Sequence, residues 1–146
     1  MKLVKSGGAL PYTFLELHNG NETYFFSDNS YNLMNFYEFV SDQYVSVFWE
    51  HHFEGILFNK LPLFKKLMFR EVIGAKAVYG SLSDKHNSEL IIPSTTYSLD
   101  EPYIEVAVGI ENILTMIRVD AIWRLTQYDN PNVTQFGVRV KLQPGF

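Results

Sequence analysis

Three stretches in the last third of the chain alternate apolar and polar residues one by one. In residues 117–126 the odd positions are apolar, and polar residues such as Arg118 and Asp120 fall on the even positions. Residues 103–110 and 134–142 repeat this alternation. Because successive side chains of a β-strand point to opposite faces, the pattern predicts three strands, each with one face suited to lipid and one suited to water.

Two earlier segments, residues 44–54 and 70–81, show the same alternation. Together the five segments predict an all-β fold, an antiparallel meander of about five to six strands. Whether residues 31–42 form a further strand or a loop is left open, because this dense aromatic run has no period that decides its structure. Residues 82–102 are polar and read as a loop. Near the start, Asn19-Gly20 between residues 12–17 and 22–26 predicts a short hairpin.

Composition limits how such a chain could meet a membrane. Its 146 residues are 16% aromatic with a mean hydropathy of -0.06. No run of about 18 apolar residues exists, so the sequence predicts no transmembrane helix. The chain therefore either stays in water or crosses a membrane as strands, and its aromatic content favours strands, since aromatic girdles mark both interfaces of membrane barrels.

Charge and cysteine content exclude several other classes. Lys and Arg total 12 against 16 acidic residues, which gives a net charge of -4 and no basic surface for a nucleic acid. With no cysteine, disulfides and thiol chemistry are excluded. The first residues lack the apolar core of a secretory signal peptide. Residues 55–68 mix apolar residues with lysines, which fits a piece lying at a membrane interface.

Four short motifs carry a resemblance to a known family: YEFVSDQYVS (37–46), EHHFEG (50–55), VGIENI (108–113) and IRVD (117–120). The chain resembles the carboxy-terminal barrel of a Bacteroidota outer-membrane family of unassigned function, whose full-length members carry an amino-terminal carboxypeptidase-regulatory-like domain. More distantly, it is similar to bacterial surface antigen and outer-membrane assembly-factor barrels. The resemblance implies an outer-membrane location and a non-enzymatic role.

On this resemblance, residues 1–30 are a lead-in with a short hairpin, or a lumen or extracellular loop, and residues 31–146 are transmembrane strands. Because five or six strands are fewer than the eight of the smallest single-chain barrels, we expect a segment of a longer barrel. The expected partners are outer-membrane lipid, the barrel assembly machinery and the remaining strands or subunits. By analogy, the signal read by that machinery comprises Gly137, Val138, Val140, Leu142 and Phe146.

Candidate chemistry is sparse, because nucleotide-binding and hydrolase motifs are absent and no cofactor is expected. On a strand, Glu50, His52 and Glu54 would share one face and are weak candidates for a metal site. We interpret them as a hydrated polar network. The polar residues predicted to face a barrel lumen are Arg118, Asp120, Arg124, Arg139 and Lys141.

One alternative from another class is a soluble all-β barrel or sandwich that binds a small apolar ligand. The two hypotheses differ in what the apolar face contacts. In a membrane, Val138→Arg is expected to cost about 2–4 kcal/mol near the midplane, whereas Arg139→Gln on the polar face is expected to cost little.

Overall fold

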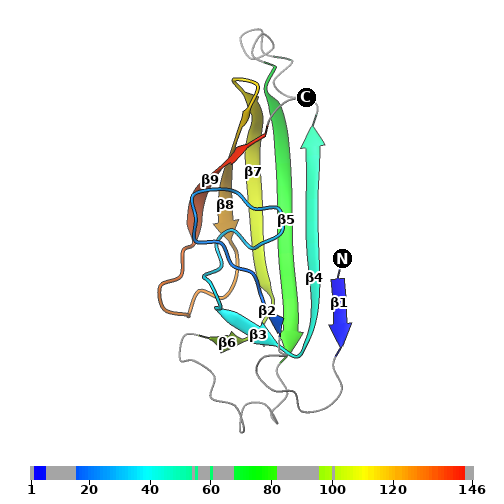
Figure 1. The fold of residues 1–146 in the computed structure, drawn as a ribbon, viewed down its shortest axis with the longest axis vertical. Coiled ribbons are helices and arrows are strands. Elements are labelled where there is room, and N and C mark those ends of the chain that lie inside the picture. The colour runs from blue at the N-terminus through cyan, green and yellow to red at the C-terminus, as the bar shows by residue number, and fades with distance from the viewer. Residues whose placement is uncertain are drawn as a thin grey trace.

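The computed structural model describes residues 2–5, 16–53, 55, 60, 68–81, 96–99 and 101–143. Within these ranges the chain forms β-strands and no α-helix (Figure 1). None of the described segments is a helix of the length and apolarity that crossing a membrane would require. The strands are β1 Lys2–Lys5, β2 Glu16–Leu17, β3 Phe39–Ser41, β4 Gln43–Phe53, β5 Arg70–Ser81, β6 Tyr97–Ser98, β7 Tyr103–Ile113, β8 Ile117–Arg124 and β9 Phe136–Leu142.

Six strands form one large sheet in the order β1-β4-β5-β7-β8-β9, and every neighbouring pair is antiparallel. Apart from β6, which joins a second sheet, the strands from β4 to β9 are added in chain order, which confirms the predicted all-β fold with an antiparallel sheet. The described strands form an open sheet whose edges are β1 and β9. The turn after β7 is tight and follows an irregularity in the β7–β8 pairing between Ile110 and Ile113.

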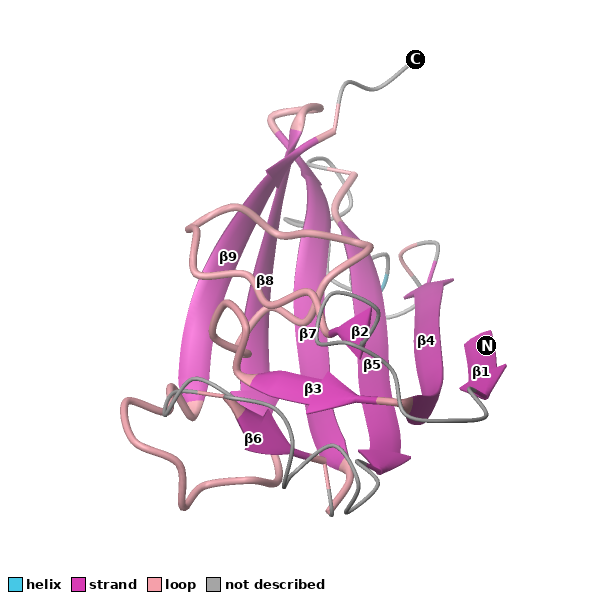
Figure 2. Ribbon diagram, turned by 60° about the horizontal axis from the view of Figure 1, so that its bottom comes forward, coloured by secondary structure: helices cyan, strands magenta, loops and turns pink. Residues whose placement is uncertain are grey.

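A second, three-stranded sheet lies against one face of the large sheet. Its order is β2-β3-β6, with β2 and β3 antiparallel but β3 and β6 parallel. Figure 2 shows β3 and β6 running crosswise to the long strands near one end of them. Residues 18–38, called the covering segment below, lead from β2 to β3 across the same face.

The predicted hairpin around Asn19-Gly20 is wrong. Leu17 pairs with Val40 of β3, and Gly20 bridges to Tyr31. A side chain on Gly20 would lie 2.4 Å from the carbonyl oxygen of Met34. Gly20 therefore serves the close approach of two backbone segments rather than a tight turn.

Two other segments need comment. Residues 31–42, which the sequence pattern left undecided, are mostly turns, and only β3 at their end is a strand. The segment predicted as a loop, residues 82–102, contains β6, which pairs with β3. The expected interfacial segment 55–68 lies almost wholly outside the described residues.

The two faces of the large sheet have opposite character. On the face away from the covering segment, apolar side chains are exposed, with values between 38% and 52% for Val47, Trp49, Ile73, Val108, Trp123 and Val138. On the covered face, Arg118, Asp120 and Arg124 are at most 2% exposed. The predicted alternation is therefore present, with charged residues inside and apolar residues outside.

Apolar side chains between the covering segment and the sheet form two small clusters. The larger contains Tyr31, Met34, Phe39, Tyr44, Val78, Leu99 and Tyr103, and the smaller contains Phe26, Leu33, Ala107 and Ile122. Each cluster joins the covering segment to residues of β5, β7 or β8. The segment is thus packed onto the sheet and also, as described next, tied to it by polar groups.

Candidate functional site

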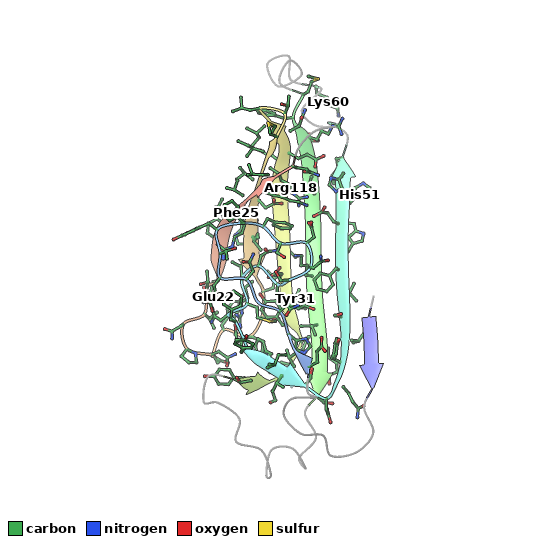
Figure 3. The ribbon with its side chains drawn as sticks, in the orientation of Figure 1. Glu22, Phe25, Tyr31, His51, Lys60 and Arg118 are labelled. Carbon is green, nitrogen blue, oxygen red and sulfur yellow. The ribbon has the colours of Figure 1, made fainter. Side chains whose placement is uncertain are left out.

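Toward the β7–β8 turn, the covered face holds an ion-paired group formed by Arg118 and Asp120 of β8 and Glu50 of β4 (Figure 3). The Arg118 Nε and Nη2 atoms donate to Asp120 at 2.8 and 2.7 Å. Its Nη1 and Nη2 atoms also donate to the two carboxylate oxygens of Glu50 at 3.0 and 2.7 Å. All five N–H groups of a guanidinium are donors, so one buried arginine can hold two carboxylates.

Space for this group comes from a glycine on the neighbouring strand. Gly109 of β7 lies opposite Asp120, and a side chain added there would meet Asp120 Oδ1 at 2.3 Å. Alternation places both residues on the covered face. Because Gly109 has no side chain, the Asp120 carboxylate can lie directly against β7.

A second ion pair joins β8 to the end of the covering segment. The Arg124 Nη2 atom donates to Glu38 Oε1 at 2.6 Å, and both side chains are at most 2% exposed. The same guanidinium donates to the carbonyl oxygens of Thr126 and Gln127, at 3.0 and 2.6 Å. Arg124 thus fixes the loop after β8 and the covering segment at one point.

The middle of the covering segment is held through its backbone. Glu105 of β7 accepts the N–H groups of Asn32 and Leu33, at 2.9 and 3.1 Å. Lys76 of β5 donates to the carbonyl oxygens of Ser30 and Ser27. Because these contacts use backbone groups, they fix the path of the chain without depending on which side chains it carries.

Strand β9 adds two contacts of a more exposed kind. Arg139 donates to the carbonyl oxygen of Asn32 at 2.9 Å, and Lys141 pairs with Asp28 at 2.7 Å. The five residues predicted to face a lumen therefore share one face of the sheet. Four of them, Arg118, Arg124, Arg139 and Lys141, contact the covering segment.

The ring of Phe26 connects the covering segment to several of these cations. Its centroid lies 4.7 Å from the Arg118 guanidinium carbon and 4.7 Å from Lys76 Nζ, and the residue is 8% exposed. Such contacts between a cation and an aromatic face are favourable when they are desolvated. Next to it, Figure 3 shows Phe25 pointing away from the sheet, in keeping with its 60% exposure.

The segment also pairs with the free edge of the sheet. The Phe26 N–H donates to the Val140 carbonyl oxygen, and the Val140 N–H donates to the Tyr24 carbonyl oxygen, both at 2.9 Å. Phe25 thereby forms an isolated parallel bridge with Val140. Of the predicted assembly-signal residues, Gly137, Val138, Val140 and Leu142 lie on β9, and Phe146 lies outside the described residues.

The weak metal candidates take part in the ion-paired group instead. Glu50 contacts His52 at 2.8 Å, and His52 contacts Glu111 at 3.1 Å. Glu54 lies outside the described residues. Within the part of the chain that is described, no three His, Asp or Glu side chains are placed to hold a metal ion.

The sequence pattern identified the strand residue in each of these contacts better than its partner in the covering segment. The strand period marks Lys76 and Glu105, since both fall on the polar side of their strands. Glu38 and Phe26 lie in an irregular segment, where no period distinguishes a residue that contacts the sheet from one in solvent. Only the fold brings Glu38 to Arg124, 86 residues away.

Comparison with known protein families matches residues 13–92, more than half of the chain, to a family described as "Family of unknown function (DUF5686) C-terminal domain". That description names no activity, ligand or location. No curated protein and no solved structure matches the chain.

Proposed function

The chain belongs to the DUF5686 family of unknown function, and from its structure we propose that it forms part of the wall of a β-barrel in the outer membrane. Its apolar face contacts lipid, and its charged face lines an interior that the covering segment fills. The role is structural, and no catalytic step is assigned to it.

The observation that carries this proposal is the reversed polarity of the large sheet. Trp49 and Val108 are 52% and 50% exposed, whereas Arg118 and Arg124 are almost completely buried. In water such an arrangement leaves apolar surface hydrated and still removes charges from solvent. In a bilayer the same exposed face is favourable, and a polar interior is what membrane barrels have.

Strand length supports the same conclusion. A tilted strand needs about 9–11 residues to cross the hydrocarbon core. Strands β4, β5 and β7 have 11, 12 and 11 residues. Each of these three strands is therefore long enough to cross a bilayer.

The sheet edges indicate how the barrel would be completed. In lipid, an open edge leaves backbone groups without hydrogen-bond partners, so β1, and β9 on either side of the bridge at Val140, must pair with further strands. Five successive antiparallel pairings separate β1 from β9, so these edge strands run in opposite directions. A six-stranded sheet with opposed edges closes into an even-numbered antiparallel barrel when an even number of strands is added. We propose that additional sequence or partner subunits supply the remaining strands.

The soluble alternative places a small apolar ligand inside the fold. The cavity between the covering segment and the sheet has a volume of about 180 Å³ and includes Phe26 and Phe48 among its lining residues. The same cavity is also lined by Glu50, Lys76 and Glu105. Charged walls disfavour an apolar guest, so the cavity favours the membrane proposal over this alternative.

Fractionation combined with one substitution tests the proposal. We expect the native chain in the detergent-extracted outer membrane, and Val138→Arg to lower the stability of the inserted protein by about 2–4 kcal/mol. Tyr24→Arg is the matched control, because Tyr24 is 83% exposed and lies off the apolar face. Recovery of the native chain as a soluble monomer, or a Val138→Arg variant as stable as the control, would overturn the proposal.

A further inference from the structure

A second hollow lies at the end of the sheet opposite to the β7–β8 turn. It has a volume of about 410 Å³, within the usual range of small-ligand sites. It lies between the covering segment, β6 and the loop that joins β8 to β9, and Figure 3 shows Glu22 toward this end. Its lining includes Glu22, Asn35, Phe36, Glu38, Tyr97 and Asn132.

The walls of this hollow are held in place by hydrogen bonds. Glu38 accepts the Asn35 backbone N–H at 2.8 Å and also pairs with Arg124. Glu22 accepts the backbone N–H of Phe36 at 2.9 Å. The Asn35 side-chain amide donates to the carbonyl oxygen of Asn132 at 3.3 Å, which joins the two sides. A site whose walls are fixed in advance loses less entropy when a ligand binds.

Left-handed backbone occurs beside the hollow as well as at other turns of the described chain. Tyr37 has a φ of 58° and Asn132 a φ of 60°, both in the left-handed region. This conformation is a genuine outlier for a residue as bulky as tyrosine. The Tyr37 carbonyl oxygen accepts the Thr96 hydroxyl at 2.9 Å, which holds the strained turn against the segment containing β6. Strained residues cluster at ligand-binding sites because the surrounding structure must maintain them.

The chemical groups of the hollow indicate a class of ligand. Phe36 is 51% exposed and offers an aromatic face beside carboxylate and amide groups. Glu38 is paired with Arg124, whereas Glu22 accepts a neutral backbone N–H and keeps its negative charge, so the hollow disfavours an anionic ligand. Both Glu38 oxygens already accept two hydrogen bonds each, but the Glu22 carboxylate keeps further lone pairs for hydroxyl donors. A neutral ring with many hydroxyl groups satisfies both the aromatic face and these acceptors.

We propose that this hollow is a binding site for a neutral saccharide of one or two rings. The site uses groups that the proposed barrel wall leaves unassigned, and it stands whether or not the sheet lies in a membrane. If the sheet does span the outer membrane and β9 ends at the periplasmic side, the hollow opens toward the outside of the cell.

Saturation-transfer NMR on the full chain tests the site directly. The probes are glucose, galactose, mannose and N-acetylglucosamine as neutral sugars, with glucosamine and glucuronate as charged comparisons. Any detergent used must lack a sugar headgroup. We expect transfer to at least one neutral sugar, with a dissociation constant on the order of 1 mM, and weaker transfer to glucuronate.

Two phenylalanine variants separate binding at this site from general adhesion. Phe36→Ala should weaken the neutral-sugar affinity by about tenfold or more. Phe25→Ala should leave it unchanged, because Phe25 is similarly exposed but does not line the hollow. Circular dichroism checks that both variants fold.

No transfer to any neutral sugar, preferential binding of glucosamine, or equal binding by the native chain and Phe36→Ala would each overturn the saccharide site. The sugar-binding results are independent of fractionation. Loss of the saccharide site would leave the barrel proposal standing. Recovery of the native chain as a soluble protein would overturn the barrel proposal and leave the saccharide site to be decided by the sugar-binding results.

Discussion

Arg124 and Glu38 lie 86 residues apart in the sequence and form an ion pair with a distance of 2.6 Å. Neither residue is more than 2% exposed. One belongs to a regular strand and the other to an irregular segment, so the pair decides where the covering segment ends against the sheet. Its contribution is better measured by removing one partner than by counting the bond, because a lone buried charge is the unfavourable state.

We expect Arg124→Met to lower the free energy of unfolding by about 3–5 kcal/mol, since Glu38 would stay buried without its partner. The double variant Arg124→Met/Glu38→Leu should be less destabilised than the single one. Urea unfolding of the native chain and these two variants measures how much of the lost stability the second substitution restores. Lys141→Ala is the control, because its partner Asp28 is exposed and such pairs contribute about 0–1 kcal/mol. Equal losses for Arg124→Met and Lys141→Ala would contradict the prediction.

Two glycines on the covered face should respond oppositely to the same change. Gly109→Ala places a methyl group 2.3 Å from Asp120 Oδ1, and we expect a loss of about 1–3 kcal/mol from overpacking. At Gly74 the nearest atoms would be 3.6 and 3.8 Å away, so Gly74→Ala should be neutral or slightly stabilising. Thermal unfolding of the two variants decides the matter, and a tolerated Gly109→Ala would mean that Asp120 can move without loss.

Adjacent phenylalanines provide a matched test of how the covering segment is anchored. Phe26→Ala removes a ring that is 8% exposed and lies against two cations, and it should cost about 3–5 kcal/mol. Phe25→Ala changes an exposed ring and should stay within about 0.5 kcal/mol. Hydrogen exchange of residues 24–33 would show whether the loss comes from release of this segment. Unchanged protection there in Phe26→Ala would contradict an anchoring role.

The buried phenol of Tyr31 indicates how the free energy of unfolding depends on pH in the alkaline range. Burial raises the pKa of its phenol above the ordinary value of 10.0. Above pH 10 the unfolded chain therefore loses this proton while the folded chain keeps it, so stability falls as the pH rises, by up to about 1.4 kcal/mol per pH unit. Tyr31→Phe should show a shallower decline in urea unfolding between pH 8 and 11. Parallel curves for the two chains would contradict the prediction.

Strand period predicted the large sheet well because each strand has a different environment on its two faces. The alternation around Arg118 and Asp120 settles which side chains share a face, but it does not predict the irregularity in the β7–β8 register between Ile110 and Ile113. Sequence also placed Arg139 and Lys141 on the charged side. A period of two is a property of the local chain, so it needs no knowledge of distant segments.

The covering segment could not be predicted in the same way. Asn19-Gly20 has the composition of a tight turn, but the absence of a side chain at Gly20 is used for the approach of residues 34 and 35. The pairing of β6 with β3 is likewise a contact between distant segments, made by only two residues of β6. Both features are contacts between segments that come together only in the folded chain. The local sequence pattern does not encode such contacts.

The hydrogen bonds between Val140 and residues 24–26 have a consequence for how the chain avoids other chains. An exposed strand edge is a template on which a foreign strand can add, and aggregation often begins there. By occupying the outward N–H and C=O groups of Val140, the chain's own earlier residues interrupt that template near the middle of β9. The folded chain is therefore protected against the addition of foreign strands at one of the two edges of its large sheet.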